Sequence, residues 1–328
     1  MHEAVELVRK SRSVLLSGHL RADGDCLGAQ IVLFHALRQI GKPVEILLPD
    51  PPDGRYGFLK AQTAWRVWDG ALPTAADLLI VCDCNHLSRL GAMGEAVAKS
   101  GMARIAVDHH VIEADHGWTA LVHDVTASAS GQLALHFAAA LGAKDLPAAA
   151  YEAAFVALMT DTGWLKYSNA TPTAWREAAE LAARGINTSR IYDLVYQQAE
   201  PERPIGIRSG LENLEYHCGG KVAFAWSEQA RLDEIGGSLA DTDEVLDLLR
   251  AVAQVEAVGF LSERPDGRIK VSFRSKSQLD VHLVAKMLHG GGHQRASGAS
   301  FPPGTTLADA VSRARAALVN GYREQGLG

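Results

Sequence analysis

The chain of 328 residues has no long hydrophobic run and only four cysteines, which excludes several classes of protein. No stretch reaches the roughly 18 apolar residues needed to cross a bilayer, so we expect no membrane span and no membrane partner. The cysteines contain no C-x-x-C pair and suggest no disulfide framework. The first residues are polar and acidic, whereas a secretory signal is basic and then apolar. We therefore expect a cytoplasmic protein.

Excess positive charge is also missing, because the formal net charge is −6. A protein that coats long nucleic acid gains affinity by neutralising many phosphates, so we expect no long nucleic acid as a partner. From His217 onward the chain carries 13 basic and 13 acidic residues, which places the whole acidic excess before that residue. A cluster of metal-binding carboxylates would contribute to such an excess, and so would a solvated acidic surface.

The first half of the chain alternates short apolar runs with helical patterns. The apolar runs, which are typical of buried strands, are residues 13–17, 44–48, 78–82 and 104–107. Helical patterns such as 27–39 and 88–99 lie between them. This alternation predicts an α/β fold with a parallel sheet and helices on both of its faces. In such sheets the functional groups collect beyond the C-terminal ends of the strands.

The pattern changes near residue 217, which predicts a second, smaller α/β domain. Its expected strands are residues 222–226, 255–261, 269–274 and 298–301, with a hairpin turn at Gly219-Gly220 and a final helix over 307–322. We therefore divide the chain into an N-terminal domain (1–187), a helical linker (188–216) and a C-terminal domain (217–328).

Acidic and imidazole side chains follow three of the predicted strands and one helical stretch. They are His19, Asp23, Asp25, Asp83, Asp108, His109, His110 and Asp161. Each has a structural explanation when it is taken alone, since an Asp between a strand and a helix is usually an N-cap and Asp-Gly-Asp is typical of a turn. Burying so many carboxylates together without cations would cost on the order of several kcal/mol per charge. Together they predict a metal centre.

The donor types also indicate which metal is expected. Oxygen and imidazole donors suit Mn²⁺ or Mg²⁺ better than zinc, which is commonly held by thiolates. Cys82 and Cys84 flank Asp83. Because side chains alternate along a strand, we expect both thiols to point away from Asp83 and to pack beneath the site.

The spacing of these residues resembles the DHH phosphoesterase superfamily. Asp108-His109-His110 is similar to the triplet that names this superfamily, and its other motifs are resembled by His19-x-x-x-Asp23-x-Asp25, Asp83 with Arg89-x-Gly91, and Asp161-Thr162-Gly163. Gly290-Gly291-Gly292-His293-x-x-Ala296-x-Gly298 resembles the signature of the DHH-associated C-terminal domain. By length and domain order, the chain is most similar to members that hydrolyse short oligoribonucleotides and 3′-phosphoadenosine 5′-phosphate (pAp).

The resemblance implies two divalent cations, with Mn²⁺ foremost and Mg²⁺ or Co²⁺ as alternatives. It implies that one cation binds His19, Asp23 and Asp83, and that the other binds Asp25, Asp83, His109 and Asp161. Asp83 would then bridge the two. The catalytic residues that it implies are Asp108, which orients imidazoles, His110, which meets the scissile phosphate or protonates the leaving oxygen, and Arg89. Two cations about 3.5–4 Å apart activate water and neutralise phosphate charge.

The resemblance also implies that the C-terminal domain binds the substrate. The residues it assigns to this role are Arg274, Ser275, Gly291, Gly292, His293 and Arg295. Glycines let a ligand approach the backbone closely, although a glycine triplet alone is equally typical of a tight turn. With the active site in the cleft between the domains, only a nucleoside bisphosphate or a short oligonucleotide would reach both sites.

We therefore expect a metal-dependent hydrolase of phosphoester bonds. Its expected reactions are the conversion of dinucleotides and other short oligoribonucleotides (nanoRNA) to mononucleotides, the dephosphorylation of pAp to AMP, or both. The alternative is a phosphodiesterase for cyclic dinucleotides of the c-di-AMP type or for linear dinucleotides. A non-catalytic nucleotide sensor is disfavoured because every ligand position is filled. The sequence leaves open the preferred substrate, the direction of degradation and whether the protein is a homodimer.

Overall fold

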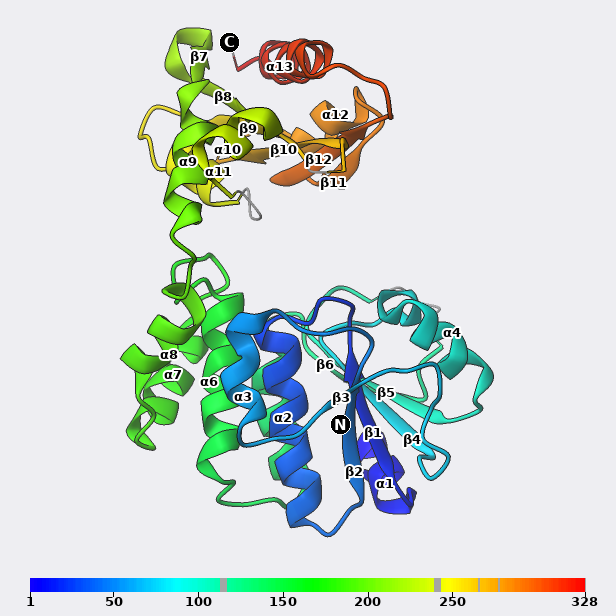
Figure 1. The fold of residues 1–328 in the computed structure, drawn as a ribbon. Helices are drawn as coiled ribbons and strands as arrows, with labels where there is room; N and C mark the ends of the chain where they lie inside the picture. Colours follow the sequence, from blue (N-terminus) through cyan, green and yellow to red (C-terminus); the bar gives the residue numbers. More distant parts are fainter. Residues whose placement is uncertain (113–116, 239–242, 265, 277, 328) are drawn as a thin grey trace. The chain divides into compact units, whose positions relative to one another are not determined.

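The computed structural model describes residues 1–112, 117–238, 243–264, 266–276 and 278–327 (Figure 1). These residues form two compact units, Met1–Gln198 and Ala199–Gly328. The boundary between the units falls inside the segment 188–216. Helix α8 (Thr188–Tyr196) belongs to the first unit and α9 (Glu202–Glu212) to the second. The division into a separate linker and two flanking domains stays a prediction.

The first unit is built on a six-stranded sheet in the order β3-β2-β1-β4-β5-β6, in which all neighbouring strands are parallel. The strands are β1 (Val14–Gly18), β2 (Val44–Leu48), β3 (Arg66–Val67), β4 (Leu78–Cys82), β5 (Ala103–Asp108) and β6 (Ala120–His123). The strand order reverses between β1 and β4. In open parallel sheets, ligand-binding groups gather in the crevice at such a reversal.

Helices cover both faces of this sheet, as the sequence predicts. One face carries α1 (His2–Lys10), α2 (Gly24–Gln39), α5 (Ser130–Leu141) and α6 (Ala148–Asp161), and the other carries η2 (Leu87–Leu90) and α4 (Ala92–Lys99) (Figure 1). Neighbouring strand residues divide between the two cores, with Leu16 in one and Leu15 in the other. This division follows from the alternation of side chains along a strand. The unit is completed by η1 (Gly54–Tyr56), α3 (Gly57–Lys60), α7 (Pro172–Ala183) and α8.

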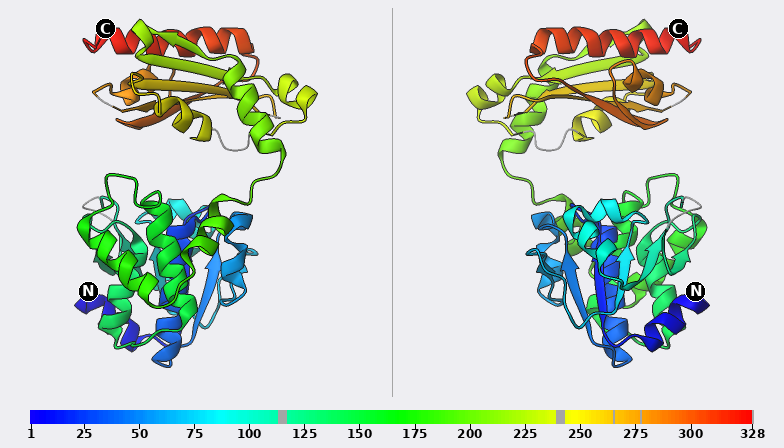
Figure 2. Two further views of the ribbon diagram at one scale, coloured as in Figure 1. Left: turned by 90° about the vertical axis from the view of Figure 1, so that its left-hand side faces the viewer. Right: turned by 90° about the vertical axis from the view of Figure 1, so that its right-hand side faces the viewer.

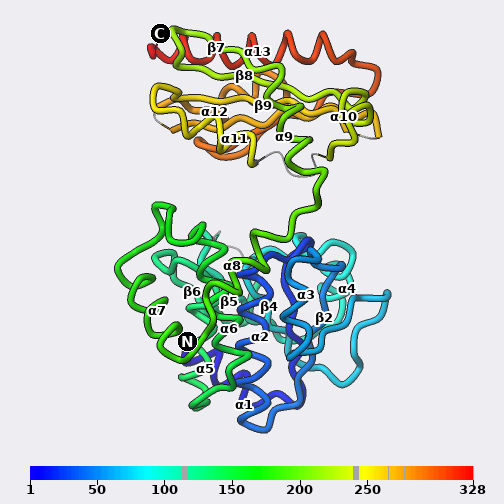
Figure 3. The backbone as a smooth tube through the Cα atoms, turned by 60° about the vertical axis from the view of Figure 1, so that its left-hand side comes forward, coloured from blue at the N-terminus to red at the C-terminus, as the bar shows by residue number. Residues whose placement is uncertain are grey.

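Small residues let α2, α5 and α6 pack closely together, side by side (Figure 3). A Cβ atom added to Gly28 would lie 2.8 Å from the Cβ of Ala157, and one added to Gly131 would lie 2.4 Å from the same atom. Both distances are shorter than any ordinary contact between carbon atoms. Glycine at these two positions therefore allows the helices to approach, and their approach brings the ends of α2, α5 and α6 together.

The strand alternation predicted for residues 82–84 is wrong. Cys82 packs in the core beneath α2 and α5, whereas Cys84 packs in the core on the opposite face of the sheet. Asp83 between them has a φ of 60°, so the regular strand ends at Cys82. Both thiols are buried, as expected, but they lie on different sides of the sheet.

The second unit has a mixed sheet in the order β11-β12-β10-β9-β8-β7, in which β8 and β9 are parallel and the other neighbours are antiparallel. Its strands are β7 (Glu215–His217), β8 (Val222–Ser227), β9 (Ala257–Glu263), β10 (Ile269–Ser275), β11 (Gly291–His293) and β12 (Ala296–Phe301). The predicted hairpin turn is confirmed, because η3 (Cys218–Gly220) joins the antiparallel strands β7 and β8.

Helices also cover this second sheet. Helices α12 (Val281–Lys286) and α13 (Leu307–Glu324) pack on one face, and α9, α10 (Gln229–Ile235) and α11 (Asp243–Arg250) pack on the other (Figure 2). Strand β11, which lies in the glycine motif, was not predicted from the sequence, because glycine is depleted in strands. Among the described helices, none combines the length and apolarity that a membrane span requires.

Candidate metal centre

Side chains from several elements of the first unit meet beside the carboxyl ends of β1, β4 and β5. His19 follows β1, Asp83 follows β4 and His109 follows β5. Two groups of three side chains have ligand atoms that all lie within 4.8 Å of one another: His19, Asp23 and Asp83, and Asp25, His109 and Asp161. Asp83 also belongs to a third such group, with His109 and His110. The structure thus brings together all six residues that the sequence suggested as ligands.

The first group has its imidazole oriented for a cation. His19 Nε2 lies 3.3 Å from Asp83 Oδ2 and 3.9 Å from Asp23 Oδ1. His19 Nδ1 lies 2.8 Å from the carbonyl oxygen of Leu20, which can only accept a hydrogen bond. A proton on Nδ1 would leave the lone pair of Nε2 available to a cation held together with the two carboxylates.

Asp23 also has the structural role that its position suggests. Its Oδ1 accepts hydrogen bonds from the backbone N–H groups of Asp25 and Cys26, so it is the N-cap of α2. No such role is seen for Asp83, which precedes no helix directly. Asp83 has a positive φ and is buried. The usual explanation for an Asp after a strand therefore accounts for Asp23 and not for Asp83.

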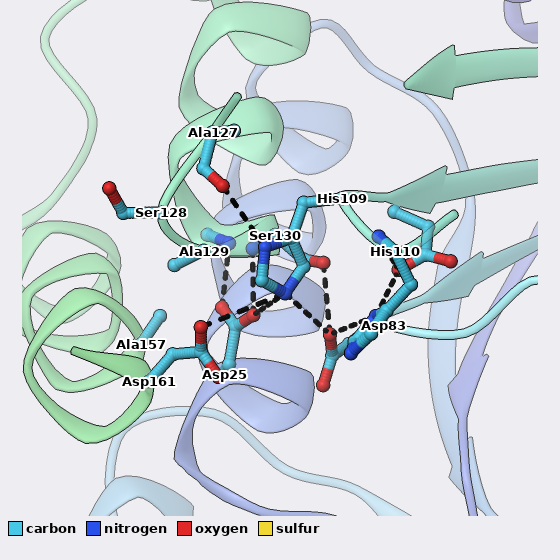
Figure 4. Close-up of polar contacts among 12 residues, drawn as sticks. Asp25, Asp83, His109, His110, Ala127, Ser128, Ala129, Ser130, Ala157 and Asp161 are labelled. Carbon is cyan, nitrogen blue, oxygen red and sulfur yellow. Dashed lines mark hydrogen bonds and ion pairs between the residues drawn. The ribbon is translucent and has the colours of Figure 1, made fainter. Parts of the chain in front are cut away.

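Three carboxylates surround His109, those of Asp25 and Asp161 in the second group and that of Asp83 (Figure 4). His109 Nε2 lies 3.6 Å from Asp83 Oδ1, 3.7 Å from Asp161 Oδ2 and 3.8 Å from Asp25 Oδ2. These distances are too long for hydrogen bonds. Among the described residues this buried Nε2 atom has no hydrogen-bond partner. Atoms that each lie about 2.1 Å from one cation are roughly 3–4 Å apart, so the spacing fits a shared divalent ion.

The carboxylates carry more negative charge than their surroundings neutralise. Burial raises the pKa of Asp25 well above its ordinary value, and the nearby Asp83 and Asp161 raise it further. Burial also raises the pKa of Asp83 and that of Asp161. Cations at this place would supply the missing positive charge and keep the carboxylates ionised.

Asp108 and His110 form a hydrogen-bonded pair beside these groups. His110 Nδ1 lies 2.8 Å from Asp108 Oδ1, and Asn85 Nδ2 donates to Asp108 Oδ2 at 2.6 Å. The bond to Asp108 is the main reason why the pKa of His110 rises to about 9. Burial acts to raise the pKa of Asp108, but the hydrogen bonds from His110 and Asn85 outweigh burial and hold it below the ordinary value. In the absence of bound cations, this pKa favours the protonated form of His110 at neutral pH, on an imidazole that is half exposed.

Arg89 and Gly91 lie at the turn that follows Asp83. The carbonyl oxygen of Arg89 accepts a hydrogen bond of 2.8 Å from Leu20 N, which ties this turn to the segment after His19. Gly91 has a φ of 58°, and a Cβ atom there would lie 2.9 Å from Leu20 Cδ1. The side chain of Arg89 is exposed. The two contacts with Leu20 are therefore made by the backbone of Arg89 and by Gly91.

Sequence reasoning missed several residues that hold the candidate ligands. Asp25 accepts hydrogen bonds of 2.7 Å from Ser130 N and 2.8 Å from Gly131 N, at the first turn of α5. Asn169 Nδ2 donates to Asp161 Oδ2 at 3.2 Å. The start of α5 could have been recognised in the sequence, because Gln132 at the third helical position is typical of a capping box. No comparable signal marks Asn169.

The substrate-binding residues suggested by sequence lie in the second unit, where two of them share a row of the sheet. Arg274 of β10 pairs with Ala296 of β12, which pairs with His293 of β11. Directly opposed residues of antiparallel strands point to the same face, so Arg274 and His293 lie on one face with a small side chain between them. Gly292 has a φ of 137°, and a Cβ atom there would lie 2.7 Å from Ser297 Oγ.

Ser275 and Arg295 meet at the end of this row. Ser275 N donates a hydrogen bond of 3.1 Å to the carbonyl oxygen of Arg295. The hydroxyl group of Ser275 is buried and has no hydrogen-bond partner among the described residues. Gly291, His293 and Arg295 are all exposed. The glycine motif is therefore an exposed edge strand and not the tight turn that a glycine triplet alone would suggest.

Metal binding should be visible as a gain in stability. Adding Mn²⁺ to metal-free protein at about 100 times its dissociation constant is expected to stabilise the first unit by about 2.7 kcal/mol. For a unit of this size the melting temperature should rise by roughly 5–10 °C. Thermal denaturation with and without Mn²⁺ measures the shift, and excess chelator should reverse it. An unchanged melting temperature at millimolar Mn²⁺ would contradict a metal centre here.

Both units match known families. Residues 13–162 match the DHH family, N-terminal domain, and residues 219–320 match the DHHA1 domain. The bifunctional oligoribonuclease and PAP phosphatase NrnA of Thermus thermophilus is 28% identical over 290 residues, which cover 88% of this chain and 84% of that protein. The protein of the same name from Bacillus subtilis is 25% identical over 310 residues, covering 91% and 92%.

A solved structure shares the fold. The exopolyphosphatase-related protein from Bacteroides fragilis aligns with a TM-score of 0.88 over 99% of this chain and 96% of its own. The two sequences are 23% identical, so this likeness shows the fold alone.

Proposed function

The chain belongs to the DHH family, with a DHHA1 domain after the DHH domain, and from this premise we propose that it hydrolyses short oligoribonucleotides and pAp with two divalent cations. It is a hydrolase that acts on phosphoester bonds. The observation that carries the proposed mechanism is the buried Nε2 of His109, which has no hydrogen-bond partner among the described residues and faces three carboxylates. The names of the relatives support the substrate class.

The proposed ligands divide between the two cations as the geometry groups them. His19 and Asp23 would hold one cation, and Asp25, His109 and Asp161 the other, with Asp83 shared between them. When bound, such a pair supplies an activated water and neutralises charge on the phosphate. Because the donors are carboxylate and imidazole, we propose Mn²⁺ ahead of Mg²⁺ or Co²⁺. A cytoplasmic location and a homodimer stay predictions.

His110 is the proposed proton donor. Its Nδ1 is engaged by Asp108, so its Nε2 is the atom available to a substrate on the half-exposed side of the ring. With a pKa of about 9, the imidazole holds its proton at neutral pH and can give it to the leaving oxygen. Asp108 would keep the ring oriented and stabilise its positive charge.

The second unit would bind the part of the substrate that is not being cleaved. Arg274 and His293 offer a guanidinium and an imidazole on one face, and the glycines beside them leave room for a ligand to approach the backbone. Ser275 and Arg295 would contribute from the end of the row. Such a site would favour short substrates, because a long strand would have to continue past it.

A panel of substrates tests the proposed function. Dinucleotides to pentanucleotides of RNA, pAp, cyclic dinucleotides and pyrophosphate would each be assayed with Mn²⁺, Mg²⁺ or Co²⁺. We expect mononucleotides from the linear RNAs and AMP from pAp, fastest with Mn²⁺. Cleavage of cyclic dinucleotides alone would favour the alternative phosphodiesterase, and binding without turnover would indicate a nucleotide sensor.

Removing the guanidinium of Arg274 should weaken substrate binding. A charge-assisted hydrogen bond to phosphate contributes about 1.5–3 kcal/mol, so Arg274→Ala should raise KM for a dinucleotide roughly 10- to 150-fold with a smaller change in kcat. Lys270→Ala is the matched control, because Lys270 is an exposed cation on the same strand, four residues before Arg274 and therefore on the same face. Equal effects of the two substitutions would argue against a specific role for Arg274.

A further inference from the structure

One short segment at the start of α5 contacts candidate ligands from separate elements; we call residues 127–131 the ligand turn (Figure 4). The carbonyl oxygen of Ala127 accepts a hydrogen bond of 3.1 Å from His109 Nδ1, which leaves Nε2 of that ring free for a cation. The backbone N–H of Ser130 donates to Asp25 at 2.7 Å. The turn therefore orients one imidazole and one carboxylate of the same group.

The ligand turn also reaches two more candidate ligands. Ser130 Oγ donates to Asp83 Oδ1 at 3.1 Å. The carbonyl oxygen of Ser128 accepts a hydrogen bond of 3.3 Å from Asn169 Nδ2, and the same amide group donates to Asp161 at 3.2 Å. A displacement of the turn would thus move or release all the side chains around His109 together.

Gln132 holds the ligand turn in place. Its Oε1 accepts hydrogen bonds from Ser128 N at 2.6 Å and from Ala129 N at 3.1 Å. Its Nε2 donates to Glu177 Oε2 on α7 at 2.5 Å. An amide can rotate to exchange its oxygen and nitrogen, but a carboxylate can only accept. Glu177 therefore fixes the rotamer in which the amide oxygen faces the two backbone N–H groups.

The other candidate metal group is held by different contacts. His19 is oriented by the carbonyl oxygen of Leu20, and Asp23 is fixed as the N-cap of α2. Neither contact involves the ligand turn. Changes at Gln132 or Glu177 should consequently reach the group around His109 and leave the group around His19 largely intact, apart from the shared Asp83.

We propose that Gln132 and Glu177 are positioning residues for one of the two cations, the one assigned to Asp25, His109 and Asp161. This inference rests on the proposed pair of metal ions. Neither residue is among the candidate ligands, and both act through the ligand turn. Residues that orient metal ligands in this way typically change metal affinity 10- to 100-fold when they are replaced.

Titration of metal-free protein with Mn²⁺ tests the proposal, with bound metal followed by calorimetry and by electron paramagnetic resonance. Wild-type protein should bind two ions. Glu177→Ala should bind one ion with unchanged affinity and the second roughly 10- to 100-fold more weakly. Glu177→Asp, which keeps the charge but withdraws the carboxylate from Gln132, should behave in the same way and guards against a failure of the alanine variant to fold.

Two further variants separate the hydrogen bond from the charge. Glu177→Gln keeps an oxygen that can accept from Gln132 but can also donate, so it no longer excludes the flipped amide; it should weaken the second ion less than Glu177→Ala does. Glu180→Ala removes a carboxylate from the exposed side of α7 without touching Gln132, and it should leave both affinities unchanged. Rescue by Gln but not by Asp would show that the hydrogen bond matters more than the charge.

The outcomes distinguish this inference from the proposed function. If wild-type protein binds no Mn²⁺, the two-metal proposal itself fails. If wild type binds two ions and Glu177→Ala binds both equally well, only the positioning role is overturned. A variant that weakens both ions to the same extent would also overturn it, because the contacts predict a loss at one site.

Discussion

Replacing Asp83 with asparagine is expected to lower the rate of dinucleotide hydrolysis by at least about 10³-fold, which corresponds to about 4 kcal/mol of transition-state stabilisation. Asp83 contacts both groups of candidate ligands, with Oδ2 near His19 and Oδ1 near His109. An amide in its place cannot bridge two cations with negative charge. We also expect the variant to lose most of its thermal stabilisation by Mn²⁺.

Asparagine is the informative substitution because it is compatible with the local backbone conformation. Asp83 has a φ of 60°, a conformation that asparagine tolerates better than alanine or other residues with a Cβ. The amide also has nearly the shape of the carboxylate, so the contacts of Ser130 Oγ and His19 can be kept with new proton positions. Loss of activity in a variant that retains its fold would then report on charge at this position.

The metal-free variant should be at least as stable as metal-free wild type. Burial and nearby carboxylates raise the pKa of Asp83 in the folded protein above the unfolded value of about 3.9. As pH rises between these two values, the unfolded chain releases a proton that the folded chain keeps, so this group lowers the free energy of unfolding. Asparagine removes that penalty. Melting temperatures in chelator at pH 5 and pH 8 test this, and a variant clearly less stable at both would contradict it.

His110→Gln is expected to lower kcat by roughly 10²- to 10⁴-fold, the range typical for loss of a general acid. Binding of Mn²⁺ should change little, because the proposed cations are held by other side chains. Steady-state kinetics on a dinucleotide at saturating Mn²⁺ would measure kcat and KM separately. Unchanged turnover would remove His110 from the mechanism, whereas a large rise in KM alone would make it a binding residue.

Asp108→Asn gives an independent check on the role of the His110 proton. The hydrogen bond to Asp108 is the main cause that raises the pKa of His110 to about 9. If activity requires protonated His110, the rate should fall as pH rises through that pKa, and loss of the carboxylate should move this fall to lower pH. The pH profile of kcat for wild type and variant measures the shift. A profile that does not move would mean that another group limits the rate at high pH.

The positions of the candidate ligands could be predicted because they follow from the topology of a parallel sheet. His19, Asp83 and His109 each come directly after an apolar run, and parallel strands present their carboxyl ends at one edge. The ligand turn could not be predicted in the same way. It holds Asp25 and His109 through backbone N–H and carbonyl groups, which nearly all residue types have, so Gln132 marks the start of a helix but not a contact with a ligand.

The other differences between prediction and structure arise where local preferences do not determine the backbone conformation. The alternation expected around Cys82 and Cys84 failed because the positive φ of Asp83 breaks the strand, and an Asp in a left-handed conformation is not marked in a sequence. Strand β11 was missed because its glycines favour a turn in isolation and become a strand only by pairing with β12. In both cases tertiary contacts decide a conformation that local preferences leave undetermined.

The positions of the candidate ligands along the chain have a consequence for how the protein is made. Every candidate ligand lies between residues 19 and 161, and the last of them ends α6. On the ribosome, where N-terminal domains generally fold first, no complete site can exist until α6 has emerged. From then on a nascent chain with the proposed metal centre could bind ions while the DHHA1 domain is still being translated. Metal supply during synthesis would thus influence how much of the newly made protein reaches a stable first unit.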